Sequence, residues 1–263
     1  MSLDKNSCDV TVVIPTYNAA QTLGRAINSI SKQSLLPKSV ILIDDKSTDA
    51  TQAIANNLKD QGLPFTIEII TNSRNLGPGL SRNIGWDRAE TQWVAFLDAD
   101  DAWHPKKLET QIGWMRSHPE VDMTATQTSF LESRSLDNPI VATPIKLRST
   151  IFKNRIPTRS VIIKQSITER FGSGLSEDLG LWLKLLKAGK RIEKIELPLA
   201  IHFRPEYSPG GASSKLLRQE RYELLNIVRC FGVEPVLVPI ATIFSILKFF
   251  RRVLISVARK VRA

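Results

Sequence analysis

Short hydrophobic runs alternate with longer segments of helical periodicity through the first half of the chain. The runs lie at residues 9–14, 40–43, 65–70 and 93–97. Between them, apolar side chains recur every three or four positions, as on one face of a helix. These segments are residues 20–33, the residues after 47–49 up to about 59, and residues 80–89. Strands that alternate with helices predict an α/β fold with a doubly wound, mostly parallel sheet and helices on both faces.

The second half of the chain has a more mixed pattern. A predicted helix at 105–118 is followed by strand-like residues 122–131 and a polar stretch at 132–138. Further strands are predicted at 160–163, 192–195 and 199–203, with a helix through 182–188. We interpret this half as part of the same domain.

Polar residues stand where the predicted parallel strands end. Pro15 and Thr16 follow the first strand, Asp44 and Asp45 the second, and the segment Asp98-Ala99-Asp100-Asp101 the fourth. Ligands of such sheets bind at the carboxyl ends of the strands. Clustered carboxylates repel one another, and Mg²⁺ or Mn²⁺ shared with diphosphate oxygens relieves that repulsion. The alternative reading is a solvated helix N-cap.

Composition and charge narrow the class of protein. Hydrophobic residues make up 42% of the 263 positions, which excludes a disordered chain. Two cysteines without metal-binding spacing favour a reducing, cytoplasmic compartment, and the polar first nine residues show no secretory signal. The net charge is +10, but six of the excess basic residues lie after residue 247. This concentration argues against a nucleic-acid-binding face.

The carboxyl-terminal residues predict a basic amphipathic helix. The apolar run 236–247 is interrupted by Pro239 and is too short to span a bilayer. On a helical projection, apolar side chains fall opposite a basic sector formed by Lys248, Arg251, Arg252, Arg259 and Arg262. Such a helix favours peripheral binding to an anionic membrane surface, on the inner face of the membrane. An ordinary helix docked on the domain is the alternative.

Five segments together resemble one family. The strings VVIPTYNAAQTLGRAINSISKQS, IDDKSTDAT, NLGPGLSRNIG and AFLDADD occur in this order within residues 9–118, and SEDLGLWLKLLKAG follows at 176–189. The chain resembles the family 2 inverting nucleotide-sugar glycosyltransferases, which have the GT-A fold. The resemblance implies a catalytic domain at 1–233, with a nucleotide-sugar-binding half at 9–118 and an acceptor half at 119–233. Residues 234–263 would be the membrane-associating tail.

The resemblance also implies a set of donor contacts. Asp45 is the better candidate for the base or ribose, since a carboxylate can accept a hydrogen bond from either. Arg82 would face the nucleotide sugar. Lys46 departs from the family pattern, which has glycine after the paired aspartates. The residues expected at the donor are Pro15, Thr16, Asp44, Asp45, Arg82 and Asp98.

For catalysis, the resemblance implies that Asp178 is the general base, with Glu177 beside it. A Mn²⁺ or Mg²⁺ ion at Asp100 would stabilise the departing diphosphate. His202 follows Asp178 by the spacing at which some family members place a metal-binding histidine. The alternative for Glu177 and Asp178 is that they simply begin a helix. The alternative for His202 is a structural role, which is common for a lone histidine on a strand.

We therefore expect a metal-dependent inverting glycosyltransferase of the hexosyl- or N-acetylhexosaminyl-transferase type. It would move a sugar from a UDP-sugar to a hydroxyl of a glycan or lipid-linked saccharide, in polysaccharide or glycolipid biosynthesis. One alternative is a nucleotide-sugar-binding protein without turnover. Another is a sugar nucleotidyltransferase, which would carry a glycine-rich basic loop after the first strand. A nucleic-acid-binding protein is disfavoured by where the charge lies.

Overall fold

The computed structural model describes residues 7–131, 139–204 and 216–232, and the pairs 239–240, 242–243, 245–246 and 249–250. Its elements are, in chain order, β1 (Ser7–Thr16), α1 (Leu23–Ser31), β2 (Leu36–Asp44), α2 (Thr51–Asp60), β3 (Thr66–Thr71), α3 (Pro78–Arg88), β4 (Trp93–Phe96), β5 (Ala102–Trp103), α4 (Lys107–Ser117), β6 (Met123–Phe130), β7 (Ala142–Pro144), α5 (Leu147–Phe152), the 3₁₀ turn η1 (Thr158–Ser160), β8 (Ile162–Lys164), α6 (Glu177–Lys187), β9 (Ile192–His202) and α7 (Leu216–Phe231).

A single sheet runs through the molecule in the order β3-β2-β1-β4-β8-β6-β9-β5, with β7 paired to β9. The first four strands are mutually parallel, as predicted, and β6 and β9 are also parallel. Strands β8, β5 and β7 run antiparallel to their neighbours. Only residues 97–101 separate β4 from β5, which is too short for a helical crossover, so β5 pairs with distant β9 instead.

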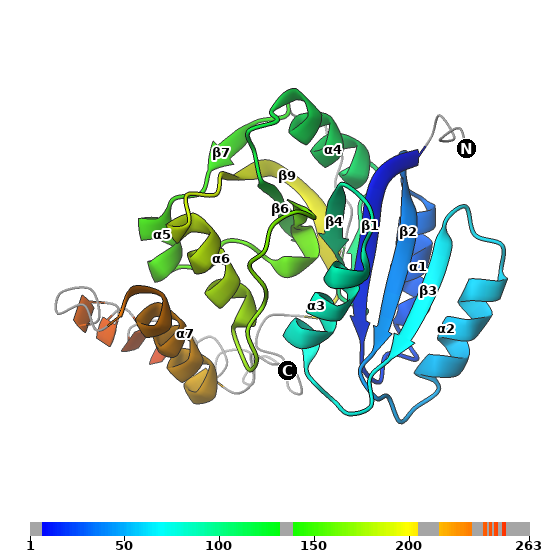
Figure 1. Cartoon of the computed structure of the whole chain (residues 1–263), viewed down its shortest axis with the longest axis horizontal. Helices are drawn as coiled ribbons and strands as arrows, with labels where there is room; N and C mark the ends of the chain where they lie inside the picture. Colours follow the sequence, from blue (N-terminus) through cyan, green and yellow to red (C-terminus); the bar gives the residue numbers. More distant parts are fainter. Residues whose placement is uncertain are drawn as a thin grey trace.

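Helices cover both faces of the sheet, which confirms the predicted layers. In Figure 1, α1 lies behind the parallel strands, α2 lies beside β3 at the right, and α3 lies in front of the strands. One apolar cluster joins α1, α2 and α4 to the sheet, and a second joins α3 and α6 to its other face. Trp182 belongs to the second cluster and is fully buried, so its role is core packing. The sheet is thus held rigidly, with its strand ends fixed.

Several elements of the second half were not predicted. Strand β9 is continuous where the sequence suggests two strands, because its register with β6 shifts at Pro198 instead of ending there. Helix α7 packs on α5 and α6 through a third apolar cluster that includes Ile151, Leu183 and Ile227. In Figure 1, α7 lies beside α6 on the side away from the parallel strands. Cys8 and Cys230 are buried free thiols.

The membrane-binding prediction falls largely on residues that the structure does not describe. Lys248, Arg251, Arg252, Arg259 and Arg262 all lie outside the described residues, as does the polar stretch 132–138. In the part of the chain that is described, no helix is both long and apolar enough to cross a bilayer. The amphipathic tail therefore stays a prediction from the sequence.

Candidate active site

The loops that follow β1 and β2 are tied to each other by hydrogen bonds. The Thr48 N–H donates to Asn18 Oδ1 at 2.9 Å, and the Asn18 N–H donates to Ser47 Oγ at 3.0 Å. Asn18 and Lys46 both have positive φ angles, 49° and 65°. Lys46 thus adopts the left-handed conformation that glycine takes easily, and the cross-loop bonds offset its steric cost of about 1 kcal/mol.

Asp45 anchors the loop before α3. Its Oδ1 accepts hydrogen bonds from Asn72 Nδ2 and the Leu76 N–H, both at 2.8 Å, and its Oδ2 accepts the Gly77 N–H at 2.8 Å. Asp44 is equally buried, yet within the described residues its carboxylate accepts only the Ser47 N–H, at 3.1 Å. Three protein donors thus bind the Asp45 carboxylate, and one lone pair on Oδ2 remains for a ligand, so the expected contact of Asp45 with the nucleotide stays a prediction. Asp44 retains more capacity for a ligand.

Pro15 and Thr16 end β1 beside these carboxylates. The Thr16 hydroxyl donates to the Ile43 carbonyl at 3.1 Å, and the Thr16 carbonyl accepts the Asp45 N–H at 2.8 Å. Thr16 is buried, and its residue pair in the parallel register is Asp44. These backbone bonds fix the two strand ends at the same edge of the sheet.

Arg82 lies between two acidic residues from different halves of the chain. Its Nη2 donates to Asp98 Oδ1 at 2.6 Å, and its Nη1 donates to Glu177 Oε1 at 2.9 Å. The Arg82 side chain is 5% exposed. Both terminal nitrogens of Arg82 are thus engaged with protein carboxylates, which makes the guanidinium a bridge between the end of β4 and the start of α6.

Gly79 permits the close approach of α3 to α6. A Cβ at this position would lie 2.6 Å from Glu177 Cγ and 2.7 Å from the Gly172 carbonyl oxygen. Gly77, by contrast, has open space around it but a positive φ of 85°. The two glycines of the segment therefore serve different needs, and Gly79 is a requirement of the Arg82–Glu177 contact.

The acidic segment after β4 is neutralised by arginines. Arg159 Nη1 donates to Asp101 Oδ2 at 2.5 Å. Burial disfavours the charge of Asp98, but Arg82 and Arg159 overcome it and lower the pKa of that carboxyl. Burial, together with the charges of Asp98 and Asp100, raises the pKa of Asp101 to about 7 despite Arg159. The two arginines therefore favour the ionised form of Asp98, whereas Asp101 titrates near neutral pH.

Asp100 is the most accessible carboxylate of the segment, with a side chain that is 34% exposed. Arg204 Nε lies 3.4 Å from its Oδ2. Arg25 of α1 donates to the Asp100 carbonyl at 2.7 Å and stacks on the Phe203 ring, with 3.8 Å between the guanidinium carbon and the ring centroid. Arg25 thereby holds Asp100 against the end of β9.

His202 stands at that end of β9. His202 pairs with Phe130 of β6 in the parallel register, and its neighbour Ile201 pairs with Ala102, directly after the acidic segment. Its Nδ1 lies 3.1 Å from the Arg204 carbonyl oxygen. A carbonyl can only accept, so Nδ1 donates in this hydrogen bond, and in the neutral imidazole that tautomer has its lone pair on Nε2.

Asp100 and His202 fit the chemistry of a divalent cation that is shared with a ligand. They supply a carboxylate oxygen and an imidazole nitrogen, both of which suit Mn²⁺. Among the described residues, no three His, Cys, Asp or Glu side chains lie close enough to hold a metal alone. An ion here would take its remaining ligands from water and from a diphosphate, as Mg²⁺ commonly does.

Asp178 lies in the first turn of α6. Its Oδ1 accepts the Leu179 N–H at 2.8 Å, and its Oδ2 accepts a hydrogen bond from Asn154 Nδ2 at 2.7 Å. Burial and then the negative charge of Glu177 raise the pKa of Asp178 to about 7, against the opposing effects of these two donors and Arg82. A carboxyl that titrates near neutral pH can take up a proton during a reaction.

Helix α7 braces the turn that leads into α6. Ser176, directly before Glu177, has a φ of 55°, and Asn226 Nδ2 donates to its carbonyl at 2.8 Å. The Tyr222 ring packs so closely on Gly174 that a Cβ there would lie 2.4 Å from it. The position of the two acidic residues therefore depends on a helix that follows them by about 40 residues.

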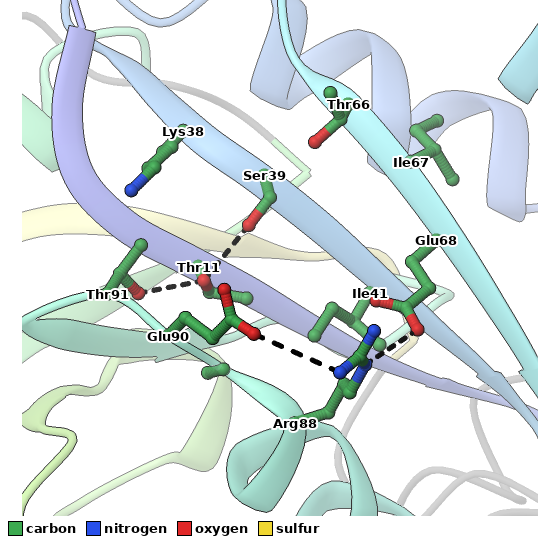
Figure 2. A pocket seen from close by; sticks show the side chains of 11 residues that line it. Thr11, Lys38, Ser39, Ile41, Thr66, Ile67, Glu68, Arg88, Glu90 and Thr91 are labelled. Atoms are coloured by element: carbon green, nitrogen blue, oxygen red, sulfur yellow. Dashed lines mark hydrogen bonds and ion pairs between the residues drawn. The ribbon is translucent and has the colours of Figure 1, made fainter. Parts of the chain in front are cut away.

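A separate groove of about 500 Å³ lies on the sheet near the amino ends of β1 and β2, away from these carboxylates. Figure 2 shows that several of its polar groups pair with one another: Thr11 bonds with Ser39 and Thr91, and Arg88 pairs with Glu68 and Glu90. It contains none of the predicted site residues.

Sequence reasoning missed Arg25, Asn154, Arg159 and Asn226. None belongs to a run of chemically similar residues. Each bonds to a residue that lies between 24 and 75 positions away in the sequence. Only the periodicity around Arg25, which places it on the helix after β1, gave any indication of where it lies.

Comparison with known proteins places the site within a family. A family model described as glycosyl transferase family 2 matches residues 11–171, which include the loops after β1, β2 and β4 but end before Glu177. The chain is 28% identical over 181 residues to the Escherichia coli UDP-Glc:alpha-D-GlcNAc-diphosphoundecaprenol beta-1,3-glucosyltransferase WfgD. That alignment covers 68% of this chain and 70% of WfgD.

Two solved structures share the fold. TarS 1–349 from S. aureus in complex with UDP matches with a TM-score of 0.63 at 22% identity, over 83% of this chain and 65% of that one. The mannosyltransferase PcManGT from Pyrobaculum calidifontis, in complex with GDP-Man and Mn²⁺, matches with a TM-score of 0.68 at 16% identity, over 97% of this chain and 75% of that one. The predicted GT-A-type fold is confirmed.

The different bonding of Asp44 and Asp45 predicts different effects of substitution. Asp45→Asn replaces one acceptor oxygen with an NH2 donor, which would face N–H groups that need an acceptor, so the free energy of unfolding should fall by about 1–3 kcal/mol. Asp44→Asn disturbs one hydrogen bond and should cost about 1 kcal/mol or less. Urea unfolding of both variants measures the difference, and equal losses would show that the Asp45 anchor is not special.

Proposed function

Because the chain belongs to glycosyl transferase family 2, we propose that it transfers a sugar from a UDP-sugar to a hydroxyl of a glycan or lipid-linked saccharide, with inversion at the anomeric carbon. The observation that carries this proposal is the position of Asp178. This carboxyl has a pKa near 7 and adjoins Glu177, which Arg82 joins to the acidic segment after β4. A proton acceptor and a diphosphate site thus share one rigid framework.

In the proposed reaction, the acceptor hydroxyl attacks C1 of the donor sugar. A bond forms between the hydroxyl oxygen and C1, the bond from C1 to the diphosphate oxygen breaks, and the hydroxyl proton passes to Asp178. Attack from the face opposite the diphosphate inverts the configuration. Glu177 stays paired with Arg82, so its charge raises the proton affinity of Asp178 without competing for the proton.

On the donor side, we propose that Asp100 and His202 hold a divalent cation. Such an ion, when bound, stabilises the negative charge on the departing diphosphate, which makes a second acidic residue unnecessary. Asp98 bonds to Arg82 and keeps the segment in place, while Arg25 fixes the Asp100 backbone. Support for a metal comes from the donor chemistry of Asp100 and His202 and from the Mn²⁺ of the PcManGT complex.

The nucleotide and acceptor are proposed from relatives and from the loops. TarS was solved with UDP, and WfgD is named for a UDP-glucose donor and a diphosphoundecaprenol-linked acceptor. Asp44, with one protein donor on its carboxylate, can accept a hydrogen bond from a uracil N–H or a ribose hydroxyl. We propose that Arg82 acts on the nucleotide sugar by positioning these acidic residues.

The role of Asp178 predicts a loss of turnover without a loss of binding. Asp178→Asn keeps the shape but cannot take the proton, so transfer from UDP-sugars to a GlcNAc-diphospholipid should fall by about 10²–10⁴-fold. The wild-type rate should rise with pH through about 7, because only the carboxylate form accepts a proton. Asp60→Asn, at an exposed site on α2, is the control. Turnover of Asp178→Asn within a few-fold of wild type would rule out this base.

The metal assignment predicts a linked loss of ion and nucleotide binding. Titration calorimetry should show that Mn²⁺ strengthens UDP binding, that UDP binds more tightly than GDP, and that Asp100→Asn removes the manganese-dependent part of the affinity. If neither EDTA nor this substitution changes the affinity for UDP, Asp100 does not hold a cation with the nucleotide.

A further inference from the structure

Asn154 bridges the loop after α5 and the first turn of α6. It lies in the segment between α5 and η1, which carries no recognisable sequence motif, and its Nδ2 donates to Asp178 Oδ2 at 2.7 Å. On its other side, Asn154 Oδ1 accepts the Ile156 N–H at 3.0 Å. The Ile156 carbonyl in turn accepts a hydrogen bond from the buried Trp182 of α6 at 3.1 Å.

These contacts fix which end of the amide faces the acid. Because a backbone N–H requires an acceptor, Asn154 Oδ1 must face Ile156, and Nδ2 must face Asp178. The loop cannot easily shift, since the Trp182 bond ties Ile156 to the same helix that carries Asp178. Asn154 is exposed, but its two partners set the orientation of its amide, with Nδ2 2.7 Å from one carboxylate oxygen of Asp178.

The remaining groups around Asp178 shift its pKa in opposite directions. Within α6, the Leu179 N–H bonds Oδ1, and Glu177 contributes a neighbouring negative charge. From α3, Arg82 contributes a positive charge, which it shares between Glu177 and Asp98. No cation in the described part of the chain is paired directly with Asp178. Asn154 is thus its one side-chain hydrogen-bond donor among the described residues.

We propose that Asn154 is a positioning residue for the general base, which holds the Asp178 carboxylate in one orientation and favours its ionised form; this rests on the proposed function. With one donor on each oxygen, the plane of the carboxylate is set by the loop and by the helix backbone. Each oxygen keeps a further lone pair with which it can accept the proton of an incoming hydroxyl.

Two substitutions separate this role from a purely structural one. Asn154→Ala removes the donor and also the bond to Ile156, whereas Asn154→Asp keeps an acceptor for the Ile156 N–H but places a negative charge beside Asp178. Positioning by a donor predicts that the acidic limb of kcat/KM moves to higher pH by about one unit in the alanine variant and further in the aspartate variant. A structural role predicts the reverse order, with the aspartate variant closer to wild type.

The experiment measures kcat/KM for UDP-sugar transfer from pH 5 to 9, with UDP affinity by calorimetry as a check on folding. Asn57→Ala, at an exposed asparagine on α2, is the matched control and should leave the profile unchanged. If the acidic limb of kcat/KM stays at the wild-type pH in both Asn154 variants, or moves in the alanine variant alone, the proposed role of Asn154 is wrong.

Asp178→Asn distinguishes the failure of this inference from the failure of the proposed function. If Asp178→Asn abolishes transfer while the Asn154 variants keep the wild-type profile, Asp178 remains the base and only the role of Asn154 is wrong. If Asp178→Asn keeps both the rate and the acidic limb, the base is assigned wrongly, and the role of Asn154 falls with it.

Discussion

A buried guanidinium between two carboxylates joins the halves of this protein. Arg82 is almost inaccessible to water, and the desolvation of its charge is costly unless it is paired. Asp98 at the end of β4 and Glu177 at the start of α6 pair its two terminal nitrogens, while its buried Nε has no hydrogen-bond partner in the described part of the chain. A lysine could not replace it, because a planar fork that donates in two directions is needed to hold both acids at once. The approach of α3 to α6 over Gly79 makes the contact possible.

The arrangement of charges around this bridge determines which acids stay ionised. Asp101 pairs with Arg159, Asp98 with Arg82, and Arg82 with Glu177, so acids and arginines alternate through the site. Asp178 lies next to Glu177, and no cation in the described residues forms an ion pair with it. Burial and its acidic neighbour therefore raise its pKa to about 7, which suits a proton acceptor at neutral pH. Asn154 moderates this effect through a neutral donor.

The sequence predicted the parallel half of the fold well, because short apolar strands and periodic helices are local signals. It also indicated the strand ends, where Asp44, Asp98 and Asp100 lie. It ranked Asp45 above Asp44 as the nucleotide contact but could not show that Asp45 anchors a loop, because the donors to Asp45 come from the distant 72–77 loop. The bracing of Ser176 by Asn226 was equally invisible, because the contact depends on how α7 packs.

The most direct test of the bridge is a double-mutant cycle between Asp98→Asn and Glu177→Gln, measured as the free energy of unfolding in urea. Each single variant leaves Arg82 one carboxylate, whereas the double variant leaves its buried charge with neither. The account predicts that the double variant loses more stability than the sum of the single losses, by about 0.5–3 kcal/mol. Losses that add to within about 0.3 kcal/mol would show that the two acids do not share Arg82, and would contradict the account.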